Sequence, residues 1–505
     1  MNIKQAKEHI KNTVKLYLKK DEFGEYRIPV VRQRPVFLLG APGVGKTAVM
    51  EQIAQELGIA LVSYSMTHHT RQSALGLPFI EEKEYGEESY RVSEYTMSEI
   101  IASIYDVMEK SGIKEGILFL DEINCVSETL APSMLQFLQY KVFGRHRVPE
   151  GWVIVTAGNP PEYNKSVREF DIVTMDRLKV LDVEAEYGVW KEYAQEKGIH
   201  NVITSYLELK KEHFYRIETT VKGRSYVTAR GWEDLSQILY LYEEEGLAAD
   251  EVLIGQYLRN ERIVKEFAAY YDLYYKYKKN YHVEEILNGN APEEVATRAK
   301  AAPFDERLSL LGMLFDIMLG ETRQGVEGAD YLNDLMPLLK GLKNLAEKES
   351  DLTLLADMLD RQVEAKKKAS DSLRLANALS EGDKRKHRRT IRFLEEAKKE
   401  LYVGDAGTAE EAFSYIKKKF DIQVREMKEE VAETKERLHR LFEFVKEAFG
   451  EENEMLILVT ELTVNISSAR FIGMFGSEDY QKYNGKLRLS GRQEDLRREI
   501  ERLEL

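Results

Sequence analysis

The residues best suited to chemistry lie in a glycine-rich stretch near the N-terminus, residues 40–47 (GAPGVGKT). Its spacing fits G-x-x-x-x-G-K-[ST], in which backbone N–H groups and the positive end of the following helix surround phosphate oxygens. Lys46 would reach the terminal phosphates of a nucleotide, and the Thr47 hydroxyl would ligate Mg²⁺. A buried-strand pattern precedes the stretch and a helical pattern follows it, which is the context that a nucleotide site requires.

Two adjacent carboxylates follow the apolar run 117–120 (ILFL). We expect Asp121 to hold magnesium through water and Glu122 to polarise the attacking water as a general base. Asn159 ends a third apolar run, beside the strand that carries Asp121, where its side chain can position this water against the terminal phosphate. Together these residues predict nucleotide binding and hydrolysis.

Three arginines are candidates for a role at the phosphates. Arg168 and Arg177 follow Asn159 in a helix-like segment on the domain surface, from which an arginine finger could enter the site of a neighbouring subunit. Arg230 lies near the start of the helix expected within residues 225–239, where a cation opposes the helix dipole. A phosphate partner would explain its presence there.

Five predicted strands must position these side chains. Four of them are continuous apolar runs, which favours a parallel sheet covered on both faces. The strands are expected at residues 36–39, 60–65, 116–120, 153–157 and 178–183. Residues 76–96 indicate a hairpin or loop inserted before a helix at 97–110, and a second hairpin is possible at 141–149.

The remainder of the chain has a helical pattern. Apolar residues step by threes and fours from 413 to 445, which is typical of a helix packing along a coiled-coil-like seam. A long helix over 352–379 ends at the turn SEGD and predicts a helical hairpin. The expected organisation is an N-terminal helix (1–24), an α/β nucleotide-binding subdomain (25–183), a helical lid (184–246), a helical region (247–350) and a long-helix, partner-binding region (351–505).

Composition limits the class of protein. The 505 residues are 43% hydrophobic and carry a formal charge of -14, which argues against non-specific nucleic-acid binding. One cysteine, no secretory apolar core and no apolar run of about 18 residues predict a cytoplasmic protein without a membrane span. We interpret the basic run 384–389 (KRKHRR) as a salt-bridged helix face and the tyrosine-rich run 270–281 as a packing face.

The ordered set GAPGVGKT, ILFLDEI, TAGNP, MDRL and TARGWEDL resembles the AAA+ ATPases, and within them the MoxR family, over about residues 25–245. The resemblance implies an α/β P-loop domain with a five-stranded parallel sheet and a helical lid. It implies that Asp121 and Glu122 form Walker B, Asn159 is sensor 1, Arg230 is sensor 2 and Arg177 is the arginine finger, with Arg168 as the alternative. ATP would be bound by Walker A and the next residue: Gly40, Ala41, Pro42, Gly43, Val44, Gly45, Lys46, Thr47 and Ala48.

The resemblance also implies a function. MoxR-like proteins use ATP and Mg²⁺ in rings, mainly hexamers, to remodel, mature or assemble a client protein, often with a separate von Willebrand factor A domain partner. Residues 350–505 are expected to bind client or partner, so that their deletion would leave basal ATPase largely intact. Two alternatives remain: a nucleic-acid-directed AAA+ motor, which would need a basic pore or stripe, and a nucleotide-locked oligomeric scaffold.

Overall fold

The computed structural model describes residues 1–68, 74, 76–163, 167–220, 223–403 and 407–486. These residues divide into two compact units. Unit 1 comprises Met1–Val189 and Val363–Ile391, and unit 2 comprises Trp190–Gln362 and the chain from Arg392 onward. The chain therefore passes from one unit to the other at residues 189–190, 362–363 and 391–392.

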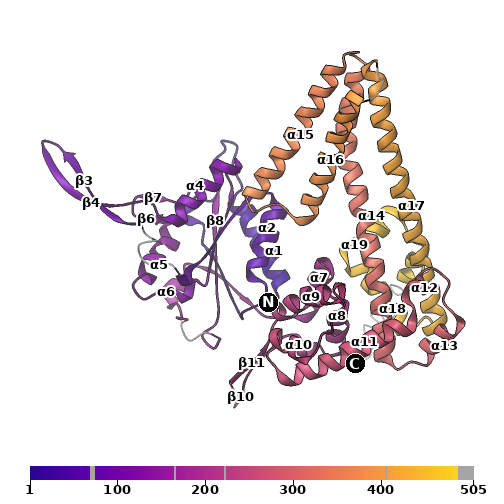
Figure 1. Cartoon of the computed structure of the whole chain (residues 1–505). Helices are drawn as coiled ribbons and strands as arrows, with labels where there is room; N and C mark the ends of the chain where they lie inside the picture. The colour runs from indigo at the N-terminus through magenta and orange to yellow at the C-terminus, as the bar shows by residue number, and fades with distance from the viewer. Residues whose placement is uncertain (69–73, 75, 164–166, 221–222, 404–406, 487–505) are drawn as a thin grey trace, which may run out of the picture. The chain divides into compact units, whose positions relative to one another are not determined.

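A five-stranded parallel sheet forms the centre of unit 1 (Figure 1). The strand order is β2-β5-β8-β1-β9, and each neighbouring pair runs parallel. Every residue of β8 is buried, as expected for a central strand covered on both faces. The predicted sheet is confirmed, with strands β1 (Val36–Gly40), β2 (Ala60–Ser65), β5 (Gly116–Asp121), β8 (Trp152–Gly158) and β9 (Lys179–Val183).

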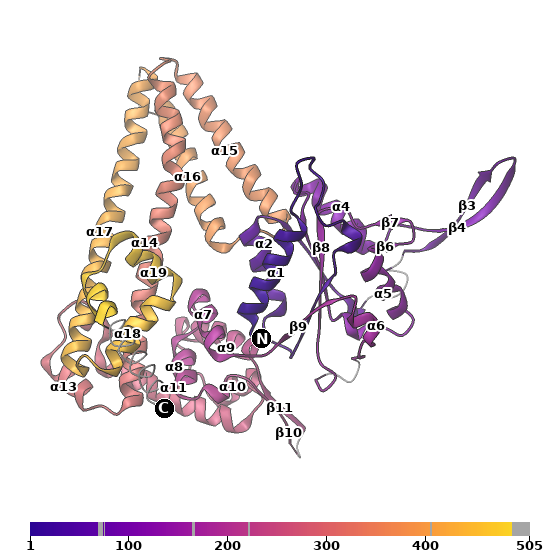
Figure 2. The same ribbon diagram turned by 180° about the vertical axis from the view of Figure 1, so that it is seen from behind.

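Helices cover both faces of this sheet (Figures 1 and 2). On one side lie α1 (Ile3–Tyr17) and α2 (Lys46–Leu57), and on the other α4 (Glu99–Ser111) and α5 (Ala131–Tyr140). An apolar core fills the second interface, where Ile100, Ile104 and Phe137 are fully buried. This packing is the reason that the strand ends, which carry the candidate site residues, have fixed positions.

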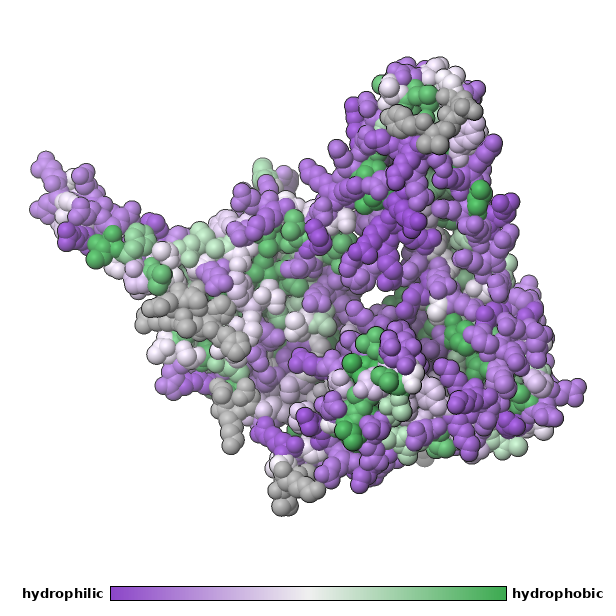
Figure 3. All heavy atoms as spheres, in the orientation of Figure 1, coloured by the Kyte–Doolittle hydropathy of each residue, from purple (hydrophilic) through white to green (hydrophobic). Residues whose placement is uncertain are grey.

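Two hairpins leave the sheet at the predicted places. The first pairs β3 (Pro78–Tyr85) with β4 (Glu88–Tyr95), and the second pairs β6 (Val142–Phe143) with β7 (His146–Arg147). The β3–β4 hairpin projects away from the core in both ribbon views, and hydrophilic residues cover most of its outer part (Figure 3).

The turn of a long helical hairpin packs against the edge strand β2. This hairpin consists of α15 (Leu352–Leu375) and α16 (Glu381–Val403). The Leu61 N–H donates to Ala376 O (2.8 Å), and Asn377 Nδ2 donates to Leu61 O (3.1 Å). Ala376 and Ala378 are buried in the same apolar core as α4. Residues 363–391, which the sequence places in the C-terminal region, thus cover an otherwise open sheet edge.

The segment predicted as a helical lid contains helices α7 (Tyr187–Lys197), α8 (Asn201–Leu209) and α9 (Ala229–Glu244). It differs from the prediction in one respect, because β10 (Arg216–Thr220) and β11 (Gly223–Val227) form an antiparallel hairpin between α8 and α9. Four of the ten strand residues, Ile217, Thr219, Thr220 and Val227, are β-branched and favour extended backbone over helix.

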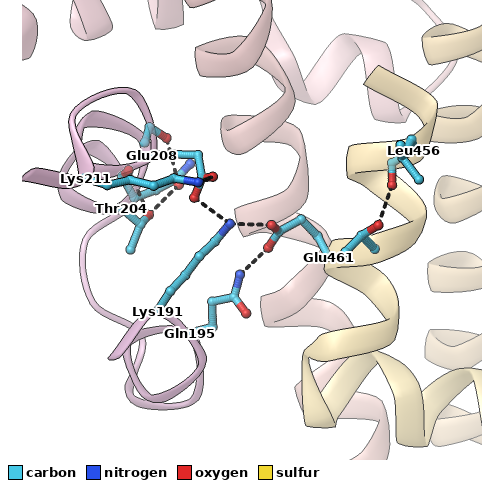
Figure 4. Close-up of polar contacts among 10 residues, drawn as sticks. Lys191, Gln195, Thr204, Glu208, Lys211, Leu456 and Glu461 are labelled. Carbon is cyan, nitrogen blue, oxygen red and sulfur yellow. Dashed lines mark hydrogen bonds and ion pairs between the residues drawn. The ribbon is translucent and has the colours of Figure 1, made fainter. Parts of the chain in front are cut away.

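An ion-pair network joins this segment to the C-terminal helices within unit 2 (Figure 4). Lys191 of α7 pairs with Glu208 of α8 at 2.9 Å and with Glu461 of α18 (Asn453–Val464), and Gln195 also donates to Glu461. Burial alone would lower the pKa of Lys191, but the two carboxylates raise it overall, so the lysine stays charged.

Long helices dominate the rest of unit 2. Helices α14 (Phe304–Ala346) and α17 (Ala409–Phe449) lie side by side in both ribbon views. Ile416, Val431 and Leu438 of the predicted seam are buried on α17, so the mostly helical C-terminal region is confirmed, whereas a coiled coil stays a prediction. The other helices are α10 (Glu251–Tyr257), α11 (Glu261–Tyr281), α12 (Val283–Leu287), α13 (Glu293–Ala301) and α19 (Ile466–Phe475).

Within the described part of the chain, no single helix combines the length and the apolar character needed to cross a membrane. Helices α18 and α19 satisfy these criteria only when taken together, and they are bent by 87° at the break between them.

Candidate functional site

The glycine-rich stretch connects β1 to α2 and is shaped for an anion. Gly43 and Gly45 have φ of +76° and +93°, a conformation that other residues rarely adopt. Gly45 is the N-cap residue of α2 and has no side chain with which to cap the first N–H groups of the helix. Those donors and the helix dipole therefore suit a phosphate at this position.

Lys46 links this loop to the end of β8. Its Nζ is buried and donates to Gly40 O (2.7 Å), Ala41 O (2.9 Å) and Asn159 Oδ1 (2.9 Å). A phosphate oxygen is an acceptor of the same kind and would compete for these donors. The lysine and the asparagine that the sequence singled out, 113 residues apart, are thus in direct contact.

Thr47 and Asp121 provide neighbouring oxygen atoms from two elements. Thr47 Oγ1, in the first turn of α2, donates to Asp121 Oδ2 at 3.0 Å, and Asp121 Oδ1 accepts from the Glu122 N–H at 2.9 Å. A hydroxyl and a carboxylate are ligands that Mg²⁺ prefers, so this pair fits the magnesium site that the sequence predicts.

Glu122 stands at a strained turn directly after β5. Its φ of +56° is left-handed, which is unfavourable for a residue with a long side chain and is typical of functional sites. Its carboxylate accepts a hydrogen bond from Ser65 Oγ at 3.1 Å. Sequence reasoning missed Ser65, although it ends the strand that pairs with β5 and so belongs to the same sheet edge.

Asn124 is a second residue that the sequence did not reveal. It follows Glu122 by two positions, is 4% exposed, and its Nδ2 donates to Asn159 O at 2.8 Å. Its own carbonyl accepts from the Arg168 N–H at 2.9 Å. The available signal was a polar residue two positions after Glu122, just past the end of β5.

Among the described contacts, the side chains of Arg168 and Arg177 do not reach Lys46, Asp121 or Glu122, and Arg168 touches the site only through its main-chain bond to Asn124. Arg168 is exposed and pairs with Glu128, and Arg177 is exposed beyond α6 (Ile172–Met175). The predicted helix containing both is wrong: α6 is short, begins at the cap residue Asp171, and includes neither arginine. Arg230 is exposed at the second position of α9, as predicted, and belongs to unit 2.

Comparison with known proteins identifies the part of the chain that carries this site. A search of curated proteins finds no match for the chain. Residues 36–174, which extend from β1 into α6 and include Lys46, Glu122 and Asn159, match the model of the ATPase family associated with various cellular activities (AAA). Over residues 36–174 the chain therefore carries an AAA ATPase domain.

Proposed function

We propose that the protein hydrolyses ATP in an oligomeric ring and uses the energy to remodel, mature or assemble a client protein, as a MoxR-like AAA+ ATPase. The observation that carries the proposal is the contact of Lys46 with Asn159 beside the Thr47–Asp121 pair. Lys46, Asn159 and the Thr47–Asp121 pair thus lie together at the carboxyl edge of one sheet, where they would bind phosphate, orient water and hold magnesium.

The roles follow from the chemistry of each group. Lys46 binds the terminal phosphates, and Thr47 and Asp121 would hold Mg²⁺, which neutralises charge on the phosphates when it is bound. Glu122 accepts the proton of the attacking water, and Asn159 orients that water. Gln at position 122 would keep the size of the side chain but lose the base, so turnover should stop while nucleotide binding remains.

The exposed Arg177 supports the ring. Its side chain is accessible, so it is available to the site of a neighbouring subunit, where it would stabilise charge in the transition state. AAA domains usually oligomerise. We propose Arg177 as the finger, Arg168 as the alternative, and Arg230 as the second sensor.

The client is proposed to be a protein rather than a nucleic acid. The basic run on α16 is partly neutralised by its own helix, because Lys384 pairs with Glu381 at 3.0 Å and Lys386 pairs with Asp383 at 2.9 Å. This arrangement supports the interpretation of a salt-bridged helix face. The long helices of unit 2 offer a large surface to a client or to a separate partner protein.

Turnover and particle mass, measured together with and without ATP, test the proposal. We expect the wild type to form a ring with ATP, E122Q to bind ATP without turnover, and R177A to bind ATP with turnover reduced roughly a thousandfold. R168A tests the alternative finger, since it removes a second exposed arginine from the same segment: turnover should persist in R168A if Arg177 is the finger and should be lost if Arg168 is. A monomer with equal turnover in all four proteins would refute the ring mechanism.

A further inference from the structure

We propose that Asn124 is a positioning residue, which holds the main chain of Asn159 so that the Asn159 carboxamide faces the terminal phosphate. The proposal rests on the proposed ATPase function and adds to it a residue outside the assigned motifs. Asn124 lies in a short 3-10 turn (Ile123–Cys125) immediately after Glu122. It therefore connects the carboxylate that activates water to the amide that orients water.

The orientation of the Asn124 side chain is determined by its neighbours. Only the amide nitrogen can donate, so Nδ2 must face the carbonyl of Asn159, 2.8 Å away. Oδ1 then lies over Gly158: a Cβ at that glycine would stand 2.5 Å from Oδ1 and 2.7 Å from Cγ. The absence of a side chain at position 158 is thus what allows Asn124 to reach the end of β8.

Folding stability alone does not explain an asparagine at position 124. Its Oδ1 is buried and has no hydrogen-bond partner among the described residues. A buried acceptor without a partner destabilises the folded state, so an apolar side chain of similar shape would avoid this cost. An apolar side chain could not replace the hydrogen-bond donor on Nδ2. For this reason we infer that Asn124 serves to hold Asn159 in position.

Loss of this donor would release the end of β8. The Asn159 carbonyl would lose its partner, and the main chain that carries the Asn159 carboxamide could rotate away from Lys46, whose Nζ now lies 2.9 Å from Asn159 Oδ1. Phosphate binding depends chiefly on the glycine loop and Lys46 and would persist. The expected defect is therefore in kcat and not in the affinity for ATP.

Asn124→Leu tests the proposal, with Thr156→Val as the matched control. Thr156 lies in β8, the strand that leads to Asn159, is fully buried and donates its hydroxyl to Val36 O at 3.0 Å. Each variant therefore removes one buried side-chain donor to a main-chain carbonyl. We expect Asn124→Leu to lower kcat roughly tenfold to a hundredfold, as for other residues that orient a catalytic group, with unchanged ATP affinity. Thr156→Val should leave kcat unchanged.

A double variant distinguishes the loss of Asn159 positioning from a general disturbance of the fold. In an Asn159→Ala background, Asn124→Leu should lower kcat no further, because the group it positions is already absent. An equal loss in both backgrounds, an equal loss in Thr156→Val, or an unchanged kcat would overturn the proposal.

A crystal structure of Asn124→Leu provides a measurement that does not depend on turnover. It should show the Asn159 carboxamide displaced from Lys46, and an undisplaced side chain would overturn the assignment. If the wild type shows no ATPase activity, the proposed function fails, and this structure still decides whether Asn124 positions Asn159.

Discussion

The buried lysine at position 141 predicts that the stability of unit 1 depends on pH. Lys141 ends α5 in a left-handed conformation, is 3% exposed, and its Nζ donates to Val30 O at 2.7 Å in the segment that leads to β1. Burial lowers the pKa of this lysine from 10.5 to about 8. The charged ammonium therefore destabilises the folded state at neutral pH, and replacement by methionine removes the titration.

The sign and size of the effect follow from the two pKa values. Between pH 8 and 10.5 the unfolded chain binds more protons than the folded one, so stability rises with pH across this window. The full cost of the charge below the window is about 3 kcal/mol, since one pKa unit corresponds to about 1.4 kcal/mol. Between pH 7 and pH 9.5 the wild type should regain about 2 kcal/mol relative to K141M.

Tryptophan fluorescence during urea unfolding measures this difference. Trp152 is the single tryptophan of unit 1, because Trp190 and Trp232 belong to unit 2. In a background with phenylalanine at positions 190 and 232, the signal reports unit 1, and other titrating groups cancel between the two proteins. Stability curves that run parallel from pH 7 to pH 9.5 for the wild type and K141M would refute the reasoning.

Two further predictions concern close backbone contacts. Asn377→Gly should destabilise unit 1 by about 1 kcal/mol in urea unfolding, because the hydrogen bond to Leu61 O is lost. Asn377→Ala should destabilise it by about 1 kcal/mol more, because φ at this position is +54°; equal effects would contradict the strain argument. Gly158→Ala should reduce stability through its clash with Asn124, and adding Asn124→Ala should restore stability but not kcat. If the second substitution adds to the loss of stability, the steric account is wrong.

The sequence allowed prediction of those parts of the site that depend on local patterns. Asp121 and Asn159 lie at the ends of apolar runs, and Lys46 follows one across the glycine-rich loop; a parallel sheet brings the ends of such runs together. Ser65 and Asn124 were not predicted. The contact of Ser65 depends on which strands are neighbours, and the contact of Asn124 depends on the direction of its side chain. The spacing of residues in the sequence indicates neither. The helix predicted to contain Arg168 and Arg177 is wrong because residues 167–171 are not helical and the short helix that Asp171 caps ends before Arg177.

The contact of residues 376–378 with β2 could not be predicted for a different reason. The pattern of a helical hairpin does not indicate which element of the protein the hairpin packs against. This contact also changes what the truncation at residue 350 should do. Removing residues 350–505 would leave the Leu61 N–H and C=O without these partners and would expose the apolar core below them. Lost ATPase after that truncation would therefore reflect a damaged sheet as much as a lost partner surface.

The same contact has a consequence for synthesis of the protein in the cell. Leu61 and Asn377 are 316 residues apart along the chain. A ribosome that adds roughly 5–20 residues per second would deliver Asn377 about 15–60 s after Leu61. Until then the nascent nucleotide-binding unit presents an open strand edge, which is a template for aggregation. This chain should therefore depend on holding chaperones during translation, in proportion to how slowly its second half is made.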